Sequence, residues 1–460
     1  MNERVIIWGT GDYYSRYRED ILQMNVIALV DSDRKKQGKI IDEIQVISPE
    51  EVQDKEYDKI YIMSTAIDVI RQRMIEIGIA EQKIRYFFDL EQRRGIPVHS
   101  FESSNLSKKK AAIISHEFTV TGAPNCLLQL TKYLLRNDWH VKIGSPYDGK
   151  IKEEFQEIGA ECFVDERLMM GTLDSIEWIN GSDIIIVNTV SIYYLLRKRN
   201  VSIPLIWWLH EPLIFYRSVV PEIINSLPTE NMNVYTVSNV ADEAFHEVCK
   251  SLKTEQLMFG VEDSKKTVKK IAHEGVRFII IGQISKIKGQ DILVDAIRLL
   301  TEEERKRCEF LLVGNNDSAF AKGILNDLEC IGARYISTGA ISHEETMYEL
   351  SMSDVLICAS RVETVSMAVV EAMMLEVPAI VSDKAGVVEY IEDGVSGLVF
   401  ESENAESLYE CIQFALKNTE QSFAIGRKGR QIFRDIFETS AFIKSMDKIM
   451  TKELFCNKLI

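Results

Sequence analysis

Short apolar runs that alternate with longer helical patterns constrain the fold of this chain more than any other feature of its sequence. Such runs recur from end to end, among them "RVIIWG", "AAIIS", "DIIIVNT", "PLIWWL", "RFIIIG", "FLLVG" and "DVLICAS". Short continuous apolar strands separated by helices are typical of parallel sheets that are covered on both faces. The sequence therefore predicts an α/β fold throughout.

Two polar segments without apolar periodicity predict the domain organisation, one over residues 91–110 and one over 260–275. Two Rossmann-like domains that face each other across a cleft would hold a ligand between their strand ends. A helical pattern at the end of the chain either caps the last sheet or crosses back to the preceding domain. We expect a small Rossmann-like α/β domain over residues 1–92, a linker over 93–110, Rossmann-like domains over 111–262 and 263–437, and a helical segment over 438–460.

The charge and the apolar content exclude several classes of function. The formal net charge is −16, which disfavours nucleic acid as a partner because the chain would repel the phosphate backbone. No apolar run approaches the ~20 residues that a transmembrane helix needs, and the start lacks a signal-peptide pattern, so we expect a cytoplasmic protein. The basic runs at 108–110 and 197–199 are either solvated or contact anionic lipid at the inner membrane face, at about 1 kcal/mol per charge.

The cysteine pattern predicts neither disulfides nor a metal site. The 8 cysteines are scattered, without paired cysteines or histidines at zinc spacing. We therefore expect reduced core thiols and no metal or other cofactor.

A Gly-x-Gly turn in the first domain resembles the start of a dinucleotide-binding unit. Gly9 and Gly11 stand between a strand and a helix, and Asp31 follows the next strand. In such units the glycines let backbone amides approach a phosphate, and the acid holds a ribose. Tyr14 stands where the third glycine would be, so the alternative is a turn that needs glycine only for packing.

Two glutamates eight positions apart flank the junction between a buried strand and an apolar helix. Glu363 lies in the expected loop and Glu371 in the second turn of a helix that should begin near Ser366 and end near Glu376. The amides of Ser366 and Met367 would lie at the helix N-terminus, which favours a phosphate. The alternative is that Glu363 is a solvated loop residue and Glu371 an ordinary surface residue.

The segment that contains both glutamates resembles the donor-site signature of glycosyltransferase family 4; it reads "ETVSMAVVEAMMLEVPAIVSDKAGVVEYIEDGVSGLVF". Three further motifs precede it in the order that the family shows: "FIIIGQISKIKGQDILVDAI", "FLLVG" and "ISTGAISHEETMYELSMSDVLICAS". The family has the GT-B fold, a retaining mechanism and an E-x7-E motif. By this resemblance Glu363 would accept hydrogen bonds from the sugar hydroxyls, and Glu371 from the ribose hydroxyls. Lys288 would bind the diphosphate, and the amides of Ser366 and Met367 would bind one of its phosphates. Ile341 would lie beside the base.

Two departures from the family pattern concern the same diphosphate site. Gln283 stands where the family usually has arginine, and Ser366 where it usually has glycine. In the preceding domain, Gly122 resembles the family's glycine-rich loop, which lies close to the donor diphosphate and the acceptor, so we expect it to be a donor-binding residue. His210 resembles the family histidine that faces the donor sugar across the cleft. His116-Glu117 is a further candidate to reach the same cleft.

The resemblance implies a retaining glycosyltransferase, with Glu363, His210 and Lys288 as its catalytic residues and no metal. The donor would be a nucleoside-diphosphate sugar, most simply a UDP-sugar, and the acceptor a glycan, a lipid-linked molecule or a protein, in bacterial cell-surface polysaccharide or glycoconjugate synthesis. One alternative is a non-catalytic GT-B-like partner subunit. Another is a nucleotide-dependent oxidoreductase or epimerase in the first domain, which lacks a Tyr-x-x-x-Lys pair.

Overall fold

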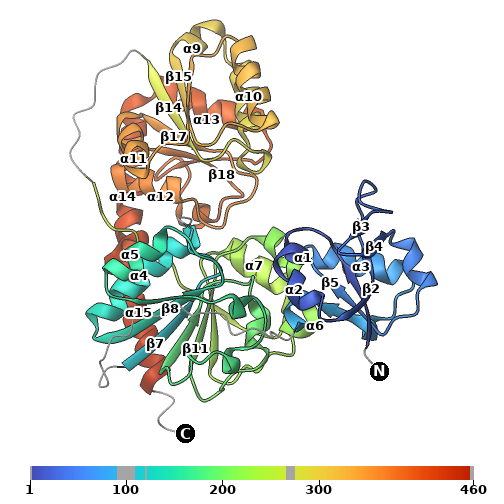
Figure 1. Ribbon diagram of the computed structural model, residues 1–460. Coiled ribbons are helices and arrows are strands. Elements are labelled where there is room, and N and C mark those ends of the chain that lie inside the picture. The colour runs from blue at the N-terminus through green and yellow to red at the C-terminus, as the bar shows by residue number, and fades with distance from the viewer. Residues whose placement is uncertain (1–2, 91–108, 120–121, 266–274, 456–460) are drawn as a thin grey trace. The chain divides into compact units, whose positions relative to one another are not determined.

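The computed structural model of the protein describes residues 3–90, 109–119, 122–265 and 275–455 (Figure 1). The chain forms two compact units, one of Met1–Tyr235 with Glu243–Glu255 and the other of Thr236–Asp242 with Gln256–Ile460. The expected linker lies outside the described residues except for Lys109 and Lys110, which already belong to a strand. The expected α/β class is confirmed, since the sheets are almost entirely parallel and alternate with helices.

The first sheet of unit 1 forms the small N-terminal domain. Its order is β3-β4-β2-β1-β5-β6, and only the β3–β4 hairpin is antiparallel. The chain turns from β1 toward β2 on one side and then continues on the other side with β5, so the strand order reverses between β1 and β5. The elements are β1 (Arg4–Trp8), α1 (Asp12–Arg16), α2 (Arg18–Ile21), β2 (Asn25–Val30), β3 (Ile40–Ile41), β4 (Ile44–Ile47), β5 (Lys59–Ile62), α3 (Ile67–Glu76) and β6 (Ile84–Tyr86).

The second sheet follows in the same unit, with the order β13-β12-β11-β10-β7-β8-β9. Its strand order reverses between β7 and β10, and both neighbours of β7 run parallel to it. The elements are β7 (Lys109–Ile114), α4 (Gly122–Arg136), β8 (Trp139–Ser145), α5 (Ile151–Glu157), β9 (Glu161–Val164), β10 (Ile184–Val187), β11 (Leu205–Leu209), α6 (Pro221–Ile224), β12 (Met232–Thr236), α7 (Asn239–Val248) and β13 (Thr254–Gln256).

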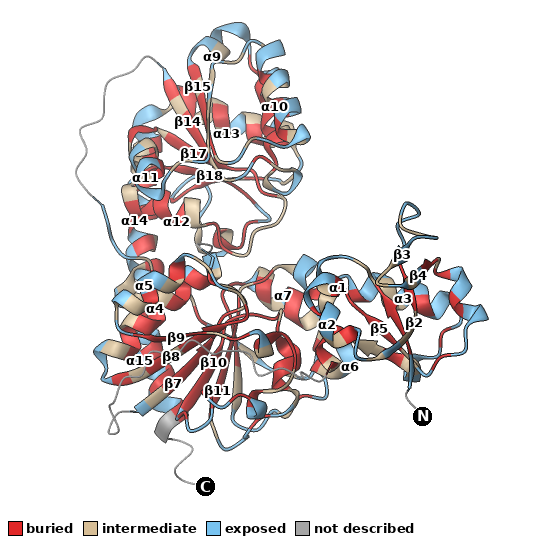
Figure 2. Cartoon of the chain, viewed as in Figure 1, coloured by how far each residue is buried: buried red, intermediate tan, exposed pale blue. Residues whose placement is uncertain are grey.

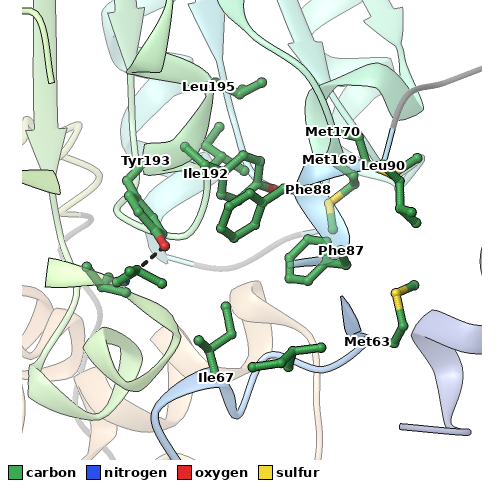
Figure 3. Packing of buried hydrophobic residues seen from close by; sticks show 14 of the residues in the cluster. Met63, Ile67, Phe87, Phe88, Leu90, Met169, Met170, Ile192, Tyr193 and Leu195 are labelled. Atoms are coloured by element: carbon green, nitrogen blue, oxygen red, sulfur yellow. Dashed lines mark hydrogen bonds between the residues drawn. The ribbon is translucent and has the colours of Figure 1, made fainter. Parts of the chain in front are cut away.

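Aromatic packing joins the small domain to the β7–β13 domain (Figure 3). The rings of Phe88 and Tyr194 stack with centroids 4.4 Å apart. Beside them, Arg197 donates to Asp89 Oδ1 at 2.6 Å. Stacked aromatic pairs contribute about 0.5–1.5 kcal/mol beyond the area they bury. The two domains therefore share one apolar core, which the sequence pattern did not predict.

Unit 2 contains the third sheet, with the order β16-β15-β14-β17-β18-β19. Helices α8, α10 and α13 pack together as one layer, and α11, α12 and α14 as the other (Figure 1). The elements are β14 (Val276–Ile281), α8 (Gln290–Leu299), α9 (Glu302–Lys306), β15 (Cys308–Val313), α10 (Ala319–Cys330), β16 (Tyr335–Gly339), α11 (His343–Met352), β17 (Val355–Cys358), α12 (Met367–Leu375), β18 (Ala379–Ser382), β19 (Leu398–Phe400), α13 (Ala405–Lys417), α14 (Thr419–Ile432) and α15 (Thr439–Phe455).

Buried strands with helices on both faces explain why the apolar runs are continuous. Every residue of β17 and β18 is buried, and Figure 2 shows β14, β15, β17 and β18 mostly in the red of buried residues. The last helix, α15, occupies the expected helical segment. Whether it crosses to the β7–β13 domain stays a prediction.

Candidate functional site

The candidate donor residues gather where the third sheet reverses its strand order. From β14 the chain moves outward to β15 and β16, and then returns to the other side of β14 with β17. Lys288 follows β14 and Glu363 follows β17, so the two residues flank the reversal. Open α/β sheets bind their ligands at this point, outside the carboxyl ends of the strands.

Lys288 and Glu363 form an ion pair, with Lys288 Nζ bonded to Glu363 Oε2. The same oxygen accepts a hydrogen bond from Ser360 Oγ at 3.3 Å. The side chains of Lys288 and Glu363 are 32% and 20% exposed, so both charges remain accessible to a ligand. Gly289 makes the turn beside Lys288 possible, because its φ is +71° and a Cβ there would lie 2.0 Å from the Ala359 carbonyl oxygen.

Arg361 fastens the loop that carries Glu363 to the loop that carries Lys288. Its guanidinium bonds both carboxylate oxygens of Asp291 at 2.9 Å and Glu403 Oε1 at 3.0 Å, and its amide donates to the Ile287 carbonyl at 2.8 Å. Burial alone would raise the pKa of Asp291, but the hydrogen bonds from Arg361 lower it below its ordinary value. Sequence reasoning missed this bridge, because Arg361 and Asp291 are seventy positions apart.

Helix α12 begins at Met367, with Ser366 at the N-cap position as expected. The Ser366 side chain does not cap the helix; its Oγ instead lies 3.5 Å from Cys358 Sγ, which donates to it. The first amides of α12 are therefore not satisfied by a side chain of the cap residue. Free N–H groups at a helix N-terminus favour an anion such as phosphate.

Glu371 is buried, at 8% exposure, so it is not the ordinary surface residue of the alternative interpretation. Its Oε1 lies 2.8 Å from Nε2 of His343, the first residue of α11. This hydrogen bond raises the pKa of His343 above its ordinary value, and the charge of Glu371 acts in the same direction. Ile341 precedes the N-cap residue of the same helix and is half-buried. Sequence reasoning did not select His343 as a site residue. The feature of the sequence that could have indicated it is its position directly after a serine at the N-cap of a helix.

Gln283 is exposed in the loop after β14, where its side chain is accessible to a ligand. The buried Gln290 fixes this loop, since its Nε2 donates to the Gln283 carbonyl at 3.2 Å and its Oε1 accepts from the Ser285 amide at 3.1 Å. The third sheet thus carries Gln283, Lys288, Ile341, Glu363, Ser366, Met367 and Glu371 after its strand ends.

The two remaining family candidates lie in unit 1, at strand ends of the second sheet. His210 follows β11, and Gly122 is the exposed first residue of α4. Burial lowers the pKa of His210 to about 3, and His116 adds to this effect, so His210 is neutral at physiological pH. Glu211 is buried beside it and accepts hydrogen bonds from the amides of Val190 and His210 at 3.1 and 3.0 Å.

The Gly-x-Gly turn of the small domain has contacts that support a packing role. Gly9 has a φ of +113°, and a Cβ there would lie 2.8 Å from the Met63 carbonyl oxygen. Gly11 precedes α1, a helix of only five residues. Asp31 already accepts from the Thr10 amide at 3.2 Å and from Lys36 Nζ at 2.9 Å. A nucleotide site here stays a prediction.

Two of the three basic residues at 197–199 bond to other parts of the protein. Arg199 is buried and donates to the carbonyls of Ile203 and Pro228, each at 3.2 Å, while Arg197 bonds Asp89. Of the run at 197–199, this leaves Lys198 exposed to solvent. Within the described residues, no helix is long and apolar enough to cross a membrane, and no group of three metal-binding side chains is present.

Two family models match parts of this chain. Residues 261–432 match "Glycosyl transferases group 1", and residues 1–85 match "C2185-like, N-terminal". The first match contains every donor-site candidate of the third sheet, and the second covers most of the small domain. The chain therefore carries a glycosyl transferases group 1 domain and an N-terminal C2185-like domain.

Curated relatives match part of the chain at low identity. Alpha-D-kanosaminyltransferase of Streptomyces kanamyceticus is 28% identical over 31% of this chain and 36% of its own length. Lipopolysaccharide 1,2-N-acetylglucosaminetransferase of Salmonella typhimurium is 23% identical over 54% of this chain and 67% of its own length. The matched region thus spans from about a third to two thirds of these relatives.

Solved glycosyltransferase structures establish the fold. HepE of Anabaena, crystallised with UDP and glucose, superposes with a TM-score of 0.61 at 18% identity and covers 75% of this chain and 100% of its own. A glycosyltransferase of Rickettsia africae gives 0.62 at 17% identity, over 76% and 99%. The expected fold class is confirmed: a GT-B fold preceded by an extra α/β domain.

Proposed function

We propose that the protein is a retaining glycosyltransferase of family 4 that transfers a sugar from a UDP-sugar to an acceptor in cell-surface polysaccharide or glycoconjugate synthesis. The observation that carries this proposal is the Lys288–Glu363 ion pair at the strand reversal, beside the N-terminus of α12. The pair offers a cation for a diphosphate and a carboxylate for sugar hydroxyls. The UDP and UDP-glucose complexes of HepE support the choice of donor.

Donor binding exchanges the partners of the ion pair. In the structure Lys288 and Glu363 neutralise each other. With donor bound, Lys288 turns to the diphosphate, and Glu363 accepts hydrogen bonds from the transferred sugar. Each charged side chain thus has a hydrogen-bonding partner both before and after the donor binds, which keeps the cost of removing it from water low.

The reaction breaks the bond between the anomeric carbon and the diphosphate oxygen and forms a bond to the acceptor oxygen on the same face of the sugar. The acceptor proton passes to the departing diphosphate. Negative charge develops on that group, and Lys288, Gln283 and the amides of Ser366 and Met367 stabilise it. Preorganised electrostatic stabilisation of this kind is usually the largest catalytic contribution. Lys288 and the partial positive charge of the α12 N-terminus take the part that a metal ion plays elsewhere, and Gln283 adds a hydrogen bond without charge, so this proposal requires no metal.

Each remaining candidate has a role that its surroundings suit. Glu371 accepts hydrogen bonds from the ribose hydroxyls, with His343 holding its carboxylate in place. Ile341 packs against the base. His210, neutral because its pKa is about 3, exchanges hydrogen bonds with the donor sugar without adding charge. Gly122 leaves room for the diphosphate at the start of α4.

A hydrolysis screen tests this function without knowledge of the acceptor. The full-length protein is incubated with a panel of UDP-, GDP-, CDP- and ADP-sugars, and the released nucleotide is measured by mass spectrometry. We expect slow release of UDP from one UDP-sugar without added metal. Binding of UDP without turnover of any sugar donor, even with acceptor extracts, would instead identify a non-catalytic partner subunit.

A further inference from the structure

A cavity of about 420 Å³ lies inside unit 1, between the small domain and the β7–β13 domain. Its volume is within the range of small-molecule sites. Both domains line it, so neither would form it alone. The lining residues are Tyr13, Thr65, Ala66, Phe87, His116, Tyr147, Met169, Ser191, Ile192, Tyr194, Ile214, Phe215, Arg217 and Ser218.

The cavity lies at the strand reversals of both sheets. In the small domain, Tyr13 follows β1 and Thr65 follows β5, the two strands between which the order reverses. In the second sheet, His116 follows β7 and Ser191 follows β10, which flank the other reversal. Since ligands of α/β sheets bind outside the carboxyl ends of strands at such points, two independent binding positions coincide here.

The chemistry of the lining fits a hydrocarbon beside an anion. Among the lining residues there is no carboxylate and no carboxamide, the side chains that would best satisfy a sugar's hydroxyls. The aromatic and aliphatic side chains dominate instead. Two basic side chains, His116 and Arg217, are among the lining residues, in a chain of net charge −16. Tyr194 adds a buried hydroxyl without a hydrogen-bond partner among the described residues.

An apolar turn leads from the cavity to the surface. Leu213, Ile214 and Phe215 are consecutive residues of a short 3-10 helix, and they are 53%, 46% and 51% exposed. This helix packs against α3 of the small domain. Contiguous exposed apolar side chains mark binding surfaces, and next to Arg217 they suit the interface of a membrane with its phosphates.

We propose that this cavity holds the hydrocarbon portion of a lipid-phosphate-linked acceptor, with Arg217 binding the phosphate. The inference rests on the proposed function and names its acceptor class. His116 lines the cavity and follows β7, and His210 follows β11 at the same edge of the second sheet, so the cavity lies on the side of the expected transfer site. The small domain then serves to complete an acceptor site.

Tryptophan substitutions at the exposed lining positions test the cavity. Ala66→Trp fills it from the small domain, and Thr65→Trp does so from the neighbouring position if the first variant folds poorly. The matched control is Val69→Trp, an exposed residue of α3 outside this lining. The probe is octyl phosphate below its micelle concentration, measured by calorimetry on the full chain. We expect saturable binding to the wild type and to the control, weakened about ten-fold or more by Ala66→Trp.

Further binding measurements distinguish a phosphate ligand from a purely apolar one and from a sugar. Arg217→Ala should weaken octyl phosphate by about five-fold or more and leave octanol binding unchanged, since only the phosphate contact is lost. Equal binding of octyl phosphate to the wild type and both filled variants would overturn the proposal. Competition by maltose but not by octanol would also overturn it, in favour of a sugar pocket. UDP affinity should be the same in all variants; if even the wild type fails to bind UDP, the proposed function fails while the cavity result stands.

Discussion

Lys288 and Glu363 are bonded to each other across the point where the third sheet reverses its strand order. One residue follows β14 and the other β17, so the contact exists only because the returning chain places β17 beside β14. A cation and a carboxylate held together at a strand reversal are ready for a ligand that carries both anionic and hydroxyl groups. A nucleotide-sugar has both.

Glu371→Ala should weaken the binding of UDP by about ten-fold or more, because a charge-assisted hydrogen bond to ribose contributes roughly 1.5–3 kcal/mol. Glu344→Ala is the control, since Glu344 is an exposed glutamate of the neighbouring helix α11. Calorimetry with UDP measures both. Unchanged affinity in folded Glu371→Ala would assign Glu371 a structural role with His343.

Gln283→Arg should tighten UDP binding, because it adds a charge beside the expected diphosphate position. Gln283 is exposed and its side chain is not needed to hold its loop, which Gln290 fixes. The gain should shrink as the salt concentration rises, since salt screens exposed charges. A titration of UDP at low and high salt measures it, and weaker binding in the folded variant would mean that Gln283 makes a different contact.

Arg361→Ala should destabilise unit 2 and disorder the donor loops together. The substitution leaves the half-buried Asp291 without its two bonds from Arg361, which costs roughly 1–3 kcal/mol. Denaturant unfolding measures the loss of stability, and calorimetry should show weaker UDP binding although Arg361 touches no expected donor atom. Arg361→Ala/Asp291→Asn should recover part of the stability, and no recovery would argue against this pair as the cause.

The His343–Glu371 pair should stabilise the protein more at low pH than at high pH. The pKa of His343 is raised from its ordinary value of 6.5, so the stabilisation is fully present below that value and is lost as the pH rises through the folded pKa. We expect His343→Ala to lower the Tm more at about pH 6 than at about pH 9. In a Glu371→Gln background this pH dependence should disappear; if it persists, another group is responsible.

Much of the donor site could be predicted from the sequence because it depends on local order along the chain. The strand, the loop with Glu363 and the helix from Met367 follow one another within a short segment, and the observed α12 begins and ends where the sequence suggests. The partners of these residues could not be predicted in the same way. His343 meets Glu371 only because α11 packs on α12.

The packing of the small domain was also beyond sequence reasoning. "RYFFDL" and "SIYYLL" contain the aromatic residues that meet, Phe88 with Tyr194. Each cluster alone is consistent with an ordinary core, and more than a hundred positions separate Phe88 from Tyr194. Only the fold shows that they bring the strand reversals of two sheets to one cavity.

The most direct test of the account is a paired measurement on Glu363→Gln, which keeps the size of the side chain and removes its charge. UDP lacks the sugar, so its affinity by calorimetry should barely change. Turnover of the UDP-sugar by mass spectrometry should fall about ten-fold or more, since ~1.4 kcal/mol of lost transition-state stabilisation gives that factor. Unchanged turnover with unchanged UDP affinity would contradict the account, because the carboxylate bonded to Lys288 would then contribute nothing to sugar transfer.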